Sequence, residues 1–260
     1  MKNMTTMKHI ISLLLLIVSG ILPVVSSAAS HFTNENLKYV ISYKWGLIHK
    51  DAGEATLSLR KNGGNYDLML AAKTKPWADK IYKVRDTLQG AIKVVDLKPV
   101  YYNKITHEKD KYARDEIRYS ISGNVTKGVA KRYRIRNGQP VKSEKTLTAQ
   151  GPVYDMLSVF YYLRKLDYSR LNKNSLYKAT VFSGDKKESV RIRNLGLAKI
   201  KLKDKTEHEA YHIRFNFTQE GGKKSSDDID TWISTDASHV PLYLVGKLPI
   251  GEVRAYLIGR

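Results

Sequence analysis

The chain has 260 residues and a formal net charge of +20 at pH 7, and it contains no cysteine. The absence of cysteine excludes a disulfide framework and the lipidated cysteine of a lipoprotein. A charge of this size attracts polyanions, although the solvated surface of a lysine-rich protein explains it equally simply.

Residues 1–29 have the features of a signal peptide. Lys2 and Lys8 supply the positive start, residues 10–25 form an apolar stretch, and small residues up to Ala29 provide a cleavage site. The alternative is an uncleaved anchor, but the apolar stretch of about 16 residues is shorter than the roughly 20 that span a bilayer. The sequence therefore predicts cleavage after residue 29.

The mature chain would begin at residue 30 and keep a net charge of +18, because the signal peptide carries two lysines and no acid. Residues 30–260 show no repeat, linker or second apolar stretch, and a domain of this size can be stable on its hydrophobic core alone. We expect one β-rich domain without a transmembrane segment, exported to the periplasm or elsewhere in a bacterial cell envelope.

Apolar and polar residues alternate over most of the mature chain, which predicts strands. Seven are expected first, at 37–45, 53–60, 65–74, 82–95, 100–107, 112–122 and 125–136. Next, Gly151-Pro152 opens a segment with apolar residues at helical spacing, which predicts one amphipathic helix near 153–166. Seven more strands are expected at 176–183, 188–194, 197–203, 210–219, 228–234, 242–247 and 251–258. The predicted fold is all-β, mainly an antiparallel sandwich or flattened barrel with one helix.

His208 to His212 match the H-E-x-x-H motif of zinc proteases letter for letter. The motif needs a helix, whereas Tyr211, Ile213 and their neighbours alternate as in a strand. Residues four apart on a strand lie about 13 Å apart, too far for two imidazoles to share one metal easily. We predict a strand with Tyr211, Ile213, Phe215 and Phe217 facing the core, and no metal.

Two kinds of charged group are candidates for a functional site. Asp155, Asp228 and Asp230 could supply the paired carboxylates of a polysaccharide hydrolase, but no nucleophile motif or phosphate-binding loop accompanies them. Two arginine runs on single strand faces could bind an anion, or they are the solvent face of a sheet. These runs are Arg132, Arg134 and Arg136, and Arg191 and Arg193.

Three segments, taken in order, carry a family resemblance. They are Tyr43 to Gly53, Asp155 to Arg164, and Trp232 to Gly251. Their characteristic residues are Trp45, Gly53, Asp155, Ser158, Tyr162, Arg164, Trp232, Asp236, Pro241 and Gly251. The chain resembles the DUF3108 family of exported bacterial proteins. The resemblance implies an all-β, YmcC-like fold in the cell envelope and supplies no catalytic residues.

Structural roles also explain these positions. Asp155 would lie in the first turn of the helix, where a carboxylate complements exposed N–H groups. Trp45 and Trp232 are expected to anchor the core, and Gly53 and Gly251 to lie at bends or bulges.

The sequence thus favours a non-enzymatic envelope protein, with no metal or cofactor, that assists surface assembly. Its expected partner is an anionic polysaccharide, lipopolysaccharide or lipid headgroup rather than nucleic acid. Two alternatives remain open: a cell-wall or capsule hydrolase, and a lipid carrier with a hollow β-core.

Overall fold

The computed structural model describes residues 32–136, 138–220, 222, 224–248 and 250–260, so the predicted signal peptide lies outside the described residues. The first eight strands are β1 (Glu35–Trp45), β2 (Ile48–Asn62), β3 (Asn65–Thr74), β4 (Val84–Lys93), β5 (Pro99–Glu108), β6 (Lys111–Ser122), β7 (Val125–Arg136) and β8 (Gln139–Gln150). The others are β9 (Val153–Tyr154), β10 (Leu176–Ser183), β11 (Lys186–Lys201), β12 (Glu207–Gln219), β13 (Ile229–Ser234), β14 (Pro241–Lys247) and β15 (Glu252–Gly259). The described part of the chain also contains two short helices, α2 (Pro76–Tyr82) and α3 (Ser158–Arg164).

All fifteen strands belong to one sheet, in the order β8-β7-β6-β5-β4-β3-β2-β1-β15-β14-β13-β12-β11-β10-β9. Every neighbouring pair is antiparallel except β9 and β10, which are parallel. The first and last strands pair in the middle of the sheet, where Val40 of β1 lies opposite Tyr256 of β15. The sheet is therefore two meanders that extend in opposite directions from β1 and β15.

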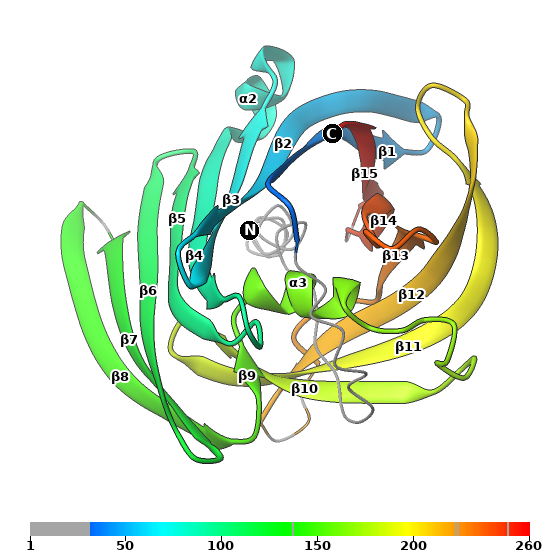
Figure 1. The fold of residues 1–260 in the computed structure, drawn as a ribbon. Coiled ribbons are helices and arrows are strands. Elements are labelled where there is room, and N and C mark those ends of the chain that lie inside the picture. The colour runs from blue at the N-terminus through cyan, green and yellow to red at the C-terminus, as the bar shows by residue number, and fades with distance from the viewer. Residues whose placement is uncertain (1–31, 137, 221, 223, 249) are drawn as a thin grey trace.

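The sheet curls into a nearly closed, barrel-like roll around α3 (Figure 1). Its two edges overlap face to face instead of pairing. Phe182 of β10 stacks on Tyr119 of β6 with ring centroids 6.0 Å apart. A Cβ atom on Gly128 of β7 would lie 2.7 Å from the Phe182 ring, so only glycine permits this approach. The predicted all-β fold with a helix near 153–166 is confirmed.

The helix is shorter than its sequence pattern indicated. Val153 and Tyr154 form β9, and α3 begins only at Ser158, because the Asp155 carboxylate holds the intervening residues in a turn. Helix α2 was not predicted, although Pro76 at its first position is a typical helix start.

The expectation that Trp45 and Trp232 anchor the core is wrong for Trp45, whose exposure is 54%. Trp45 ends β1 at an open end of the roll, where no further layer covers it. Trp232 is half-buried, but in an aromatic stack that includes His212 and Tyr243, with centroids 4.4 and 4.9 Å from its own.

Candidate functional site: an apolar cavity at one end of the roll

A cavity of about 360 Å³ lies inside one end of the rolled sheet. Its wall comes from β1, β2, β3, β14 and β15, with α2 at one side and α3 at its base. The wall includes Tyr39, Ile41, Tyr43, Ala55, Leu57, Leu70, Ala72, Leu244, Val253 and Ala255, and Met156, Leu157 and Phe160 come from the α3 region. The interior of the protein is thus partly hollow.

Side-chain size explains why this end is hollow. Inner positions of β2 and β3 at the other end carry Leu59, Tyr66 and Leu68, which are at most 3% exposed. Toward the cavity the same strands carry small residues, and Ala55 pairs directly with Ala72. A roll of fifteen strands is too wide for such residues to fill, since larger barrels enclose cavities unless bulky side chains occupy them.

Burial along β1 follows the same gradient. Leu37 and Tyr39 are 1% and 6% exposed, the inward-facing Ile41 and Tyr43 are half-buried, and Trp45 is 54% exposed. The strand therefore runs from a packed core, along the cavity wall, to an open rim.

Helix α3 forms the base of the cavity and is fixed by a buried ion pair. The Arg164 guanidinium, whose side chain is 1% exposed, binds both carboxylate oxygens of Glu35 and donates two hydrogen bonds to the carbonyl oxygen of Ser238. It also lies over the Phe32 and Tyr161 rings, at 4.9 and 5.2 Å from their centroids. Burial works to lower the pKa of Arg164, but the hydrogen bonds and charge of Glu35 outweigh it and raise the pKa.

Asp155 orders the turn before α3. One of its carboxylate oxygens accepts hydrogen bonds from the N–H groups of Leu157 and Ser158, each 2.8 Å long, and the Ser158 hydroxyl accepts one from the Asp155 N–H. The other carboxylate oxygen has no partner among the described residues. Burial raises the pKa of Asp155 to about 6, although these hydrogen bonds oppose the shift.

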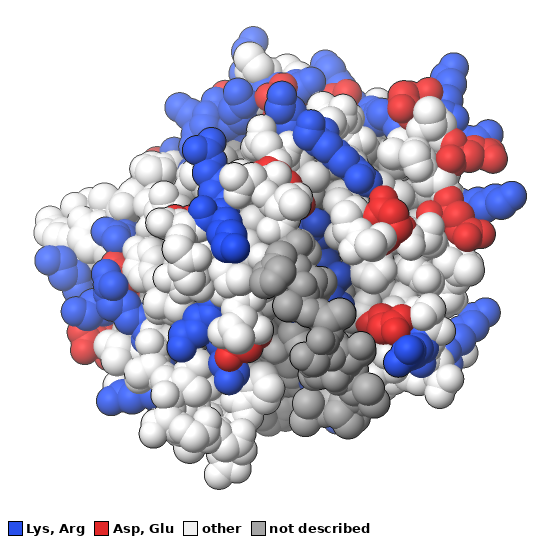
Figure 2. Space-filling model, in the orientation of Figure 1, with Lys and Arg blue, Asp and Glu red and all other residues white. Residues whose placement is uncertain are grey.

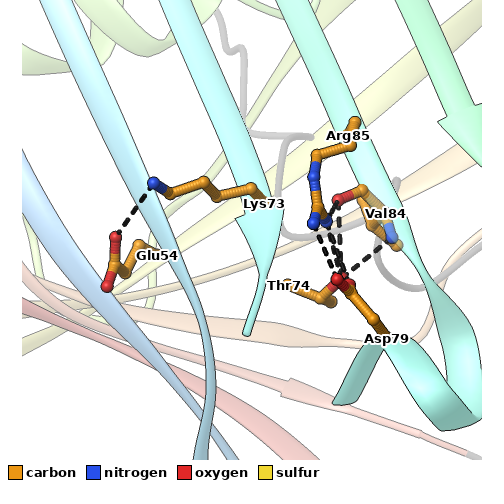
Figure 3. A network of polar contacts seen from close by, with 6 residues as sticks. All are labelled: Glu54, Lys73, Thr74, Asp79, Val84 and Arg85. Carbon is orange, nitrogen blue, oxygen red and sulfur yellow. Dashed lines mark hydrogen bonds and ion pairs between the residues drawn. The ribbon is translucent and has the colours of Figure 1, made fainter. Parts of the chain in front are cut away.

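Helix α2 lies beside the open rim and is held by a polar network (Figure 3). Arg85 donates hydrogen bonds of 3.0 and 2.7 Å to the two carboxylate oxygens of Asp79, and Thr74 donates a further one. These bonds lower the pKa of Asp79 to about 2, with Arg85 making the largest contribution. The side chain of Trp77 donates a hydrogen bond to the carbonyl oxygen of Asp51, which ties α2 to β2.

The cavity wall offers little polar chemistry. Among the described residues, its polar contributors other than aromatic side chains are Ser42, Lys50, Lys73 and Thr74, and it contains no carboxylate. The Lys50 ammonium lies 4.5 Å from the centroid of the Trp77 ring, near α2. Such a wall can hold an apolar chain, with cations close to the opening.

The H-E-x-x-H segment lies in β12, as predicted. Ile213, Phe215 and Phe217 are at most 2% exposed, and Tyr211 packs against the core. His208 contacts the Thr206 hydroxyl at 2.9 Å, whereas His212 contacts Asp230 at 2.6 Å. The segment therefore has the geometry of a strand, and the absence of a bound metal there remains a prediction.

The three candidate carboxylates do not gather at the cavity. Asp155 is 1% exposed before α3, whereas Asp228 and Asp230 lie next to β12, where Asp228 pairs with Asn216 and Asp230 with Arg214. Burial works to raise the pKa of Asp230, but hydrogen bonds from His212 and Arg214 outweigh it and lower the pKa. None of the three carboxylates lines the cavity.

The arginine runs occupy two different surroundings. Arg132 is paired with Asp115 and Asp185, and Arg134 with Asp115, so their charges are compensated. Arg136 ends β7. Arg191 and Arg193 are exposed on β11. Anion binding by these residues remains a prediction.

The ten residues that carry the resemblance divide mainly between the two ends of the roll. Trp45, Gly53 and Gly251 lie at the open end, where Gly251 has φ of +81° and leaves no room for a Cβ beside the Lys44 carbonyl. Near α3 lie Asp155, Ser158, Tyr162, Arg164, Asp236 and Pro241, with Asp236 accepting a hydrogen bond from the Ser238 N–H and Pro241 accepting one from Tyr39. Trp232 stands apart in the aromatic stack.

Sequence reasoning missed the cavity residues because each is an ordinary apolar position. The one available signal was the run of small inward residues, Gly53 and Ala55 on β2 and Ala72 on β3, whereas the inward positions further along the same strands carry leucine. Only the strand register, in which Ala55 pairs with Ala72, shows that these small residues lie side by side.

Comparisons with known proteins agree with this architecture. In the described part of the chain, neither helix has the length and apolar character needed to cross a membrane. No curated protein matches the chain. A solved structure of a β-barrel-like protein of the domain of unknown function DUF1849 from Brucella abortus is similar, with a TM-score of 0.56 and 10% sequence identity, over 88% of this chain and 97% of that one. At this identity the likeness shows the fold alone.

The family model described as "Protein of unknown function (DUF3108)" matches residues 38–258, nearly the whole described region. The chain therefore belongs to the DUF3108 family.

Proposed function

We propose that this protein is a non-enzymatic carrier of the bacterial cell envelope that binds the acyl chain of a lipid inside its rolled sheet. The observation that carries the proposal is the cavity of about 360 Å³ with an almost wholly apolar wall. Its volume is within the range of about 300–1,000 Å³ that small-molecule sites occupy. Each methylene group transferred from water to such a wall contributes roughly 0.8 kcal/mol.

The proposal unites two of the sequence-based hypotheses. A hollow β-core accounts for the acyl chain, and the charge of +18 expected for the mature chain suits a lipid whose headgroup is anionic. On the face seen in Figure 2, Lys and Arg side chains are scattered among acidic and uncharged ones instead of gathered in one patch, which favours a general attraction over one fixed glycan site. The hydrolase hypothesis has no support in the cavity, whose described lining residues include no carboxylate.

The ligand class can be identified directly. The mature protein, purified without detergent from its own host, is analysed by native mass spectrometry. We expect one extra mass that matches a lipid or fatty acid and that is released on denaturation. A co-purified glycan in its place would contradict the proposal and support the anionic-glycan hypothesis.

Two substitutions on adjacent residues of β3 test whether the cavity is the binding site. Ala72 lines the cavity and Ala71 does not, since successive side chains of a strand point to opposite faces. Ala72→Trp should lower the affinity for a fluorescent long-chain fatty acid at least about tenfold by filling the site, which corresponds to about 1.4 kcal/mol. Ala71→Trp should bind like the wild type.

Thermal unfolding checks that both tryptophan variants fold, and Ala55→Phe, across the strand pair from Ala72, provides a second way to fill the cavity. Equal affinities for all of these variants would place the fatty acid elsewhere and contradict the proposed site.

A further inference from the structure

Exposed apolar side chains gather at the open end of the roll. The described part of the chain has thirteen large apolar residues that are exposed, and five of them lie in three segments at this end. Trp45 ends β1, Leu47 lies in the turn that follows and Ile48 begins β2, whereas Ile81 belongs to α2 and Ile250 to the turn between β14 and β15. Leu47 has an exposure of 105%, so none of its side chain is covered.

Direct contacts bring these three segments together. The Tyr43 hydroxyl donates a hydrogen bond of 2.9 Å to the Ile250 carbonyl oxygen, which joins the β14–β15 turn to β1. The N–H of Lys75, just before α2, donates one of 2.8 Å to the carbonyl oxygen of Ala52 on β2. Because Trp45, Ile48 and Ile81 also line the cavity, the exposed residues form a rim continuous with its wall.

Positive charge surrounds this apolar rim. Within the described residues, four exposed lysines in these segments have no acidic partner: Lys50, Lys80, Lys83 and Lys247. The acidic groups at the same end are already engaged, Asp79 by Arg85, Asp51 by Lys203 and Glu252 by Arg254. Apolar side chains flanked by uncompensated lysines are the two signals that together hold a protein on an anionic bilayer.

We propose that this rim docks onto the surface of an anionic lipid bilayer, with Leu47 and Ile250 inserted among the acyl chains and the four lysines against the headgroups. The inference rests on the proposed function, because the docked rim would place the cavity opening directly over the source of its ligand. A protein partner is less well matched, since its interface would have to bury unpaired ammonium groups against apolar residues.

The test measures sedimentation of the full mature chain with vesicles. One set of vesicles contains phosphatidylglycerol mixed with phosphatidylcholine, and the other contains phosphatidylcholine alone. We expect strong binding to the anionic vesicles, weak binding to the neutral ones, and a fall in binding as salt is raised, because salt screens the headgroup charge.

Matched double variants separate the rim from the rest of the surface. Leu47→Asp with Ile250→Asp should lower binding to anionic vesicles at least about tenfold. Val95→Asp with Ile258→Asp is the control, because these residues are 80% and 56% exposed, carry the same charge change, and lie toward the opposite end of the roll. The control should bind vesicles like the wild type.

A second pair of variants tests the charges. Lys80→Glu with Lys83→Glu should weaken binding to anionic vesicles by about tenfold or more, since each lysine near such a surface contributes roughly 1 kcal/mol. Lys61→Glu with Lys93→Glu, at the other end of β2 and β4, should have little effect.

Fatty-acid binding in solution distinguishes failure of the docking inference from failure of the proposed function. Leu47 and Ile250 do not line the cavity, so the rim variant should keep the wild-type affinity for a fluorescent fatty acid. A wild-type protein that binds the fatty acid but not the vesicles overturns the docking inference alone. The protein could also form a dimer that the rim variants abolish while vesicle binding is unaffected. That result would assign the rim to a second copy of the chain and would also overturn the docking inference.

Discussion

The two ends of the roll are made from the same strands but differ in how they are filled. At the packed end, Leu59, Tyr66 and Leu68 are buried, and the Arg164–Glu35 ion pair lies beside Leu59, the strand partner of Glu35. At the hollow end, Gly53, Ala55 and Ala72 leave a cavity and an exposed rim. One end therefore supplies the stability of the fold, and the other gives up part of its packing to create space for a ligand.

The comparison shows that one alternating pattern can produce both a core and a binding site. Inward residues are apolar along the whole length of β2 and β3, so the strands form in the same way at both ends. Whether an end becomes a packed core or a cavity depends on the volume of its inward side chains. Protein interiors are normally close-packed, and every unfilled volume loses dispersion contacts.

The largest effect on stability is expected at the packed end. Arg164→Ala should lower the free energy of unfolding by about 3–5 kcal/mol, because it leaves Glu35 partly buried without its cation. Urea denaturation measures this change. Arg164→Met combined with Glu35→Gln should recover a large part of the loss, since neither charge then remains. A loss below about 1 kcal/mol for Arg164→Ala would show that this end does not carry the stability of the fold.

Two leucines on β3 compare the ends directly. Leu68 is 3% exposed in the packed core, whereas the next inward residue, Leu70, is half-buried and lines the cavity. Leu68→Ala should cost about 2–5 kcal/mol in the free energy of unfolding because it creates a new cavity. Leu70→Ala should cost about 1 kcal/mol, because it only enlarges an existing space. Equal costs would mean that the hollow end is packed in solution.

Asp155 should make stability depend on pH. Burial raises its pKa to about 6, well above the ordinary value for an aspartate, so the folded state holds this proton more tightly than the unfolded state does. Stability from this group is complete below about pH 4 and declines as pH rises through 6, by at most about 3 kcal/mol.

Asp155→Asn keeps an oxygen for the Leu157 and Ser158 N–H groups but removes the buried charge. Relative to the wild type, its unfolding free energy should therefore increase between pH 4 and pH 7.5 by up to about 3 kcal/mol, as measured by urea denaturation of both proteins at both pH values. Asp155→Ala is the control that loses the cap as well, and it should be destabilised at both pH values. An Asp155→Asn variant whose stability changes between pH 4 and 7.5 in the same way as that of the wild type would contradict the raised pKa.

The smallest effect is expected at the rim. Asp79→Asn weakens the attachment of α2, and hydrogen exchange of the α2 amides should become faster while global stability changes little. In the wild type this attachment is present above about pH 4 and is lost as pH falls through about 2, because the pKa of Asp79 is lowered. Glu54→Gln, in the neighbouring exposed pair with Lys73, should leave exchange in α2 unchanged (Figure 3).

Local sequence patterns predicted several features correctly for physical reasons. The alternation of apolar and polar residues over 210–219 correctly predicted a strand despite the complete match to the zinc motif, because a strand buries Ile213, Phe215 and Phe217 on one face. The role of Asp155 at the start of the helix also followed from its own neighbourhood, since its partners are only two and three residues away. The start of α3 was misplaced because the apolar spacing continues through this turn, where the backbone is not helical.

The amino-acid sequence by itself determined that the chain folds into strands around one helix, because strand and helix periodicity are properties of consecutive residues. Only the tertiary structure decided where the interior is filled. Ala55 meets Ala72 through strand register, Phe182 meets Gly128 through the curl of the sheet, and Trp45 is exposed because the roll ends there. Whether an inward residue packs or lines a cavity depends on what lies opposite it, and that neighbour is distant in the sequence.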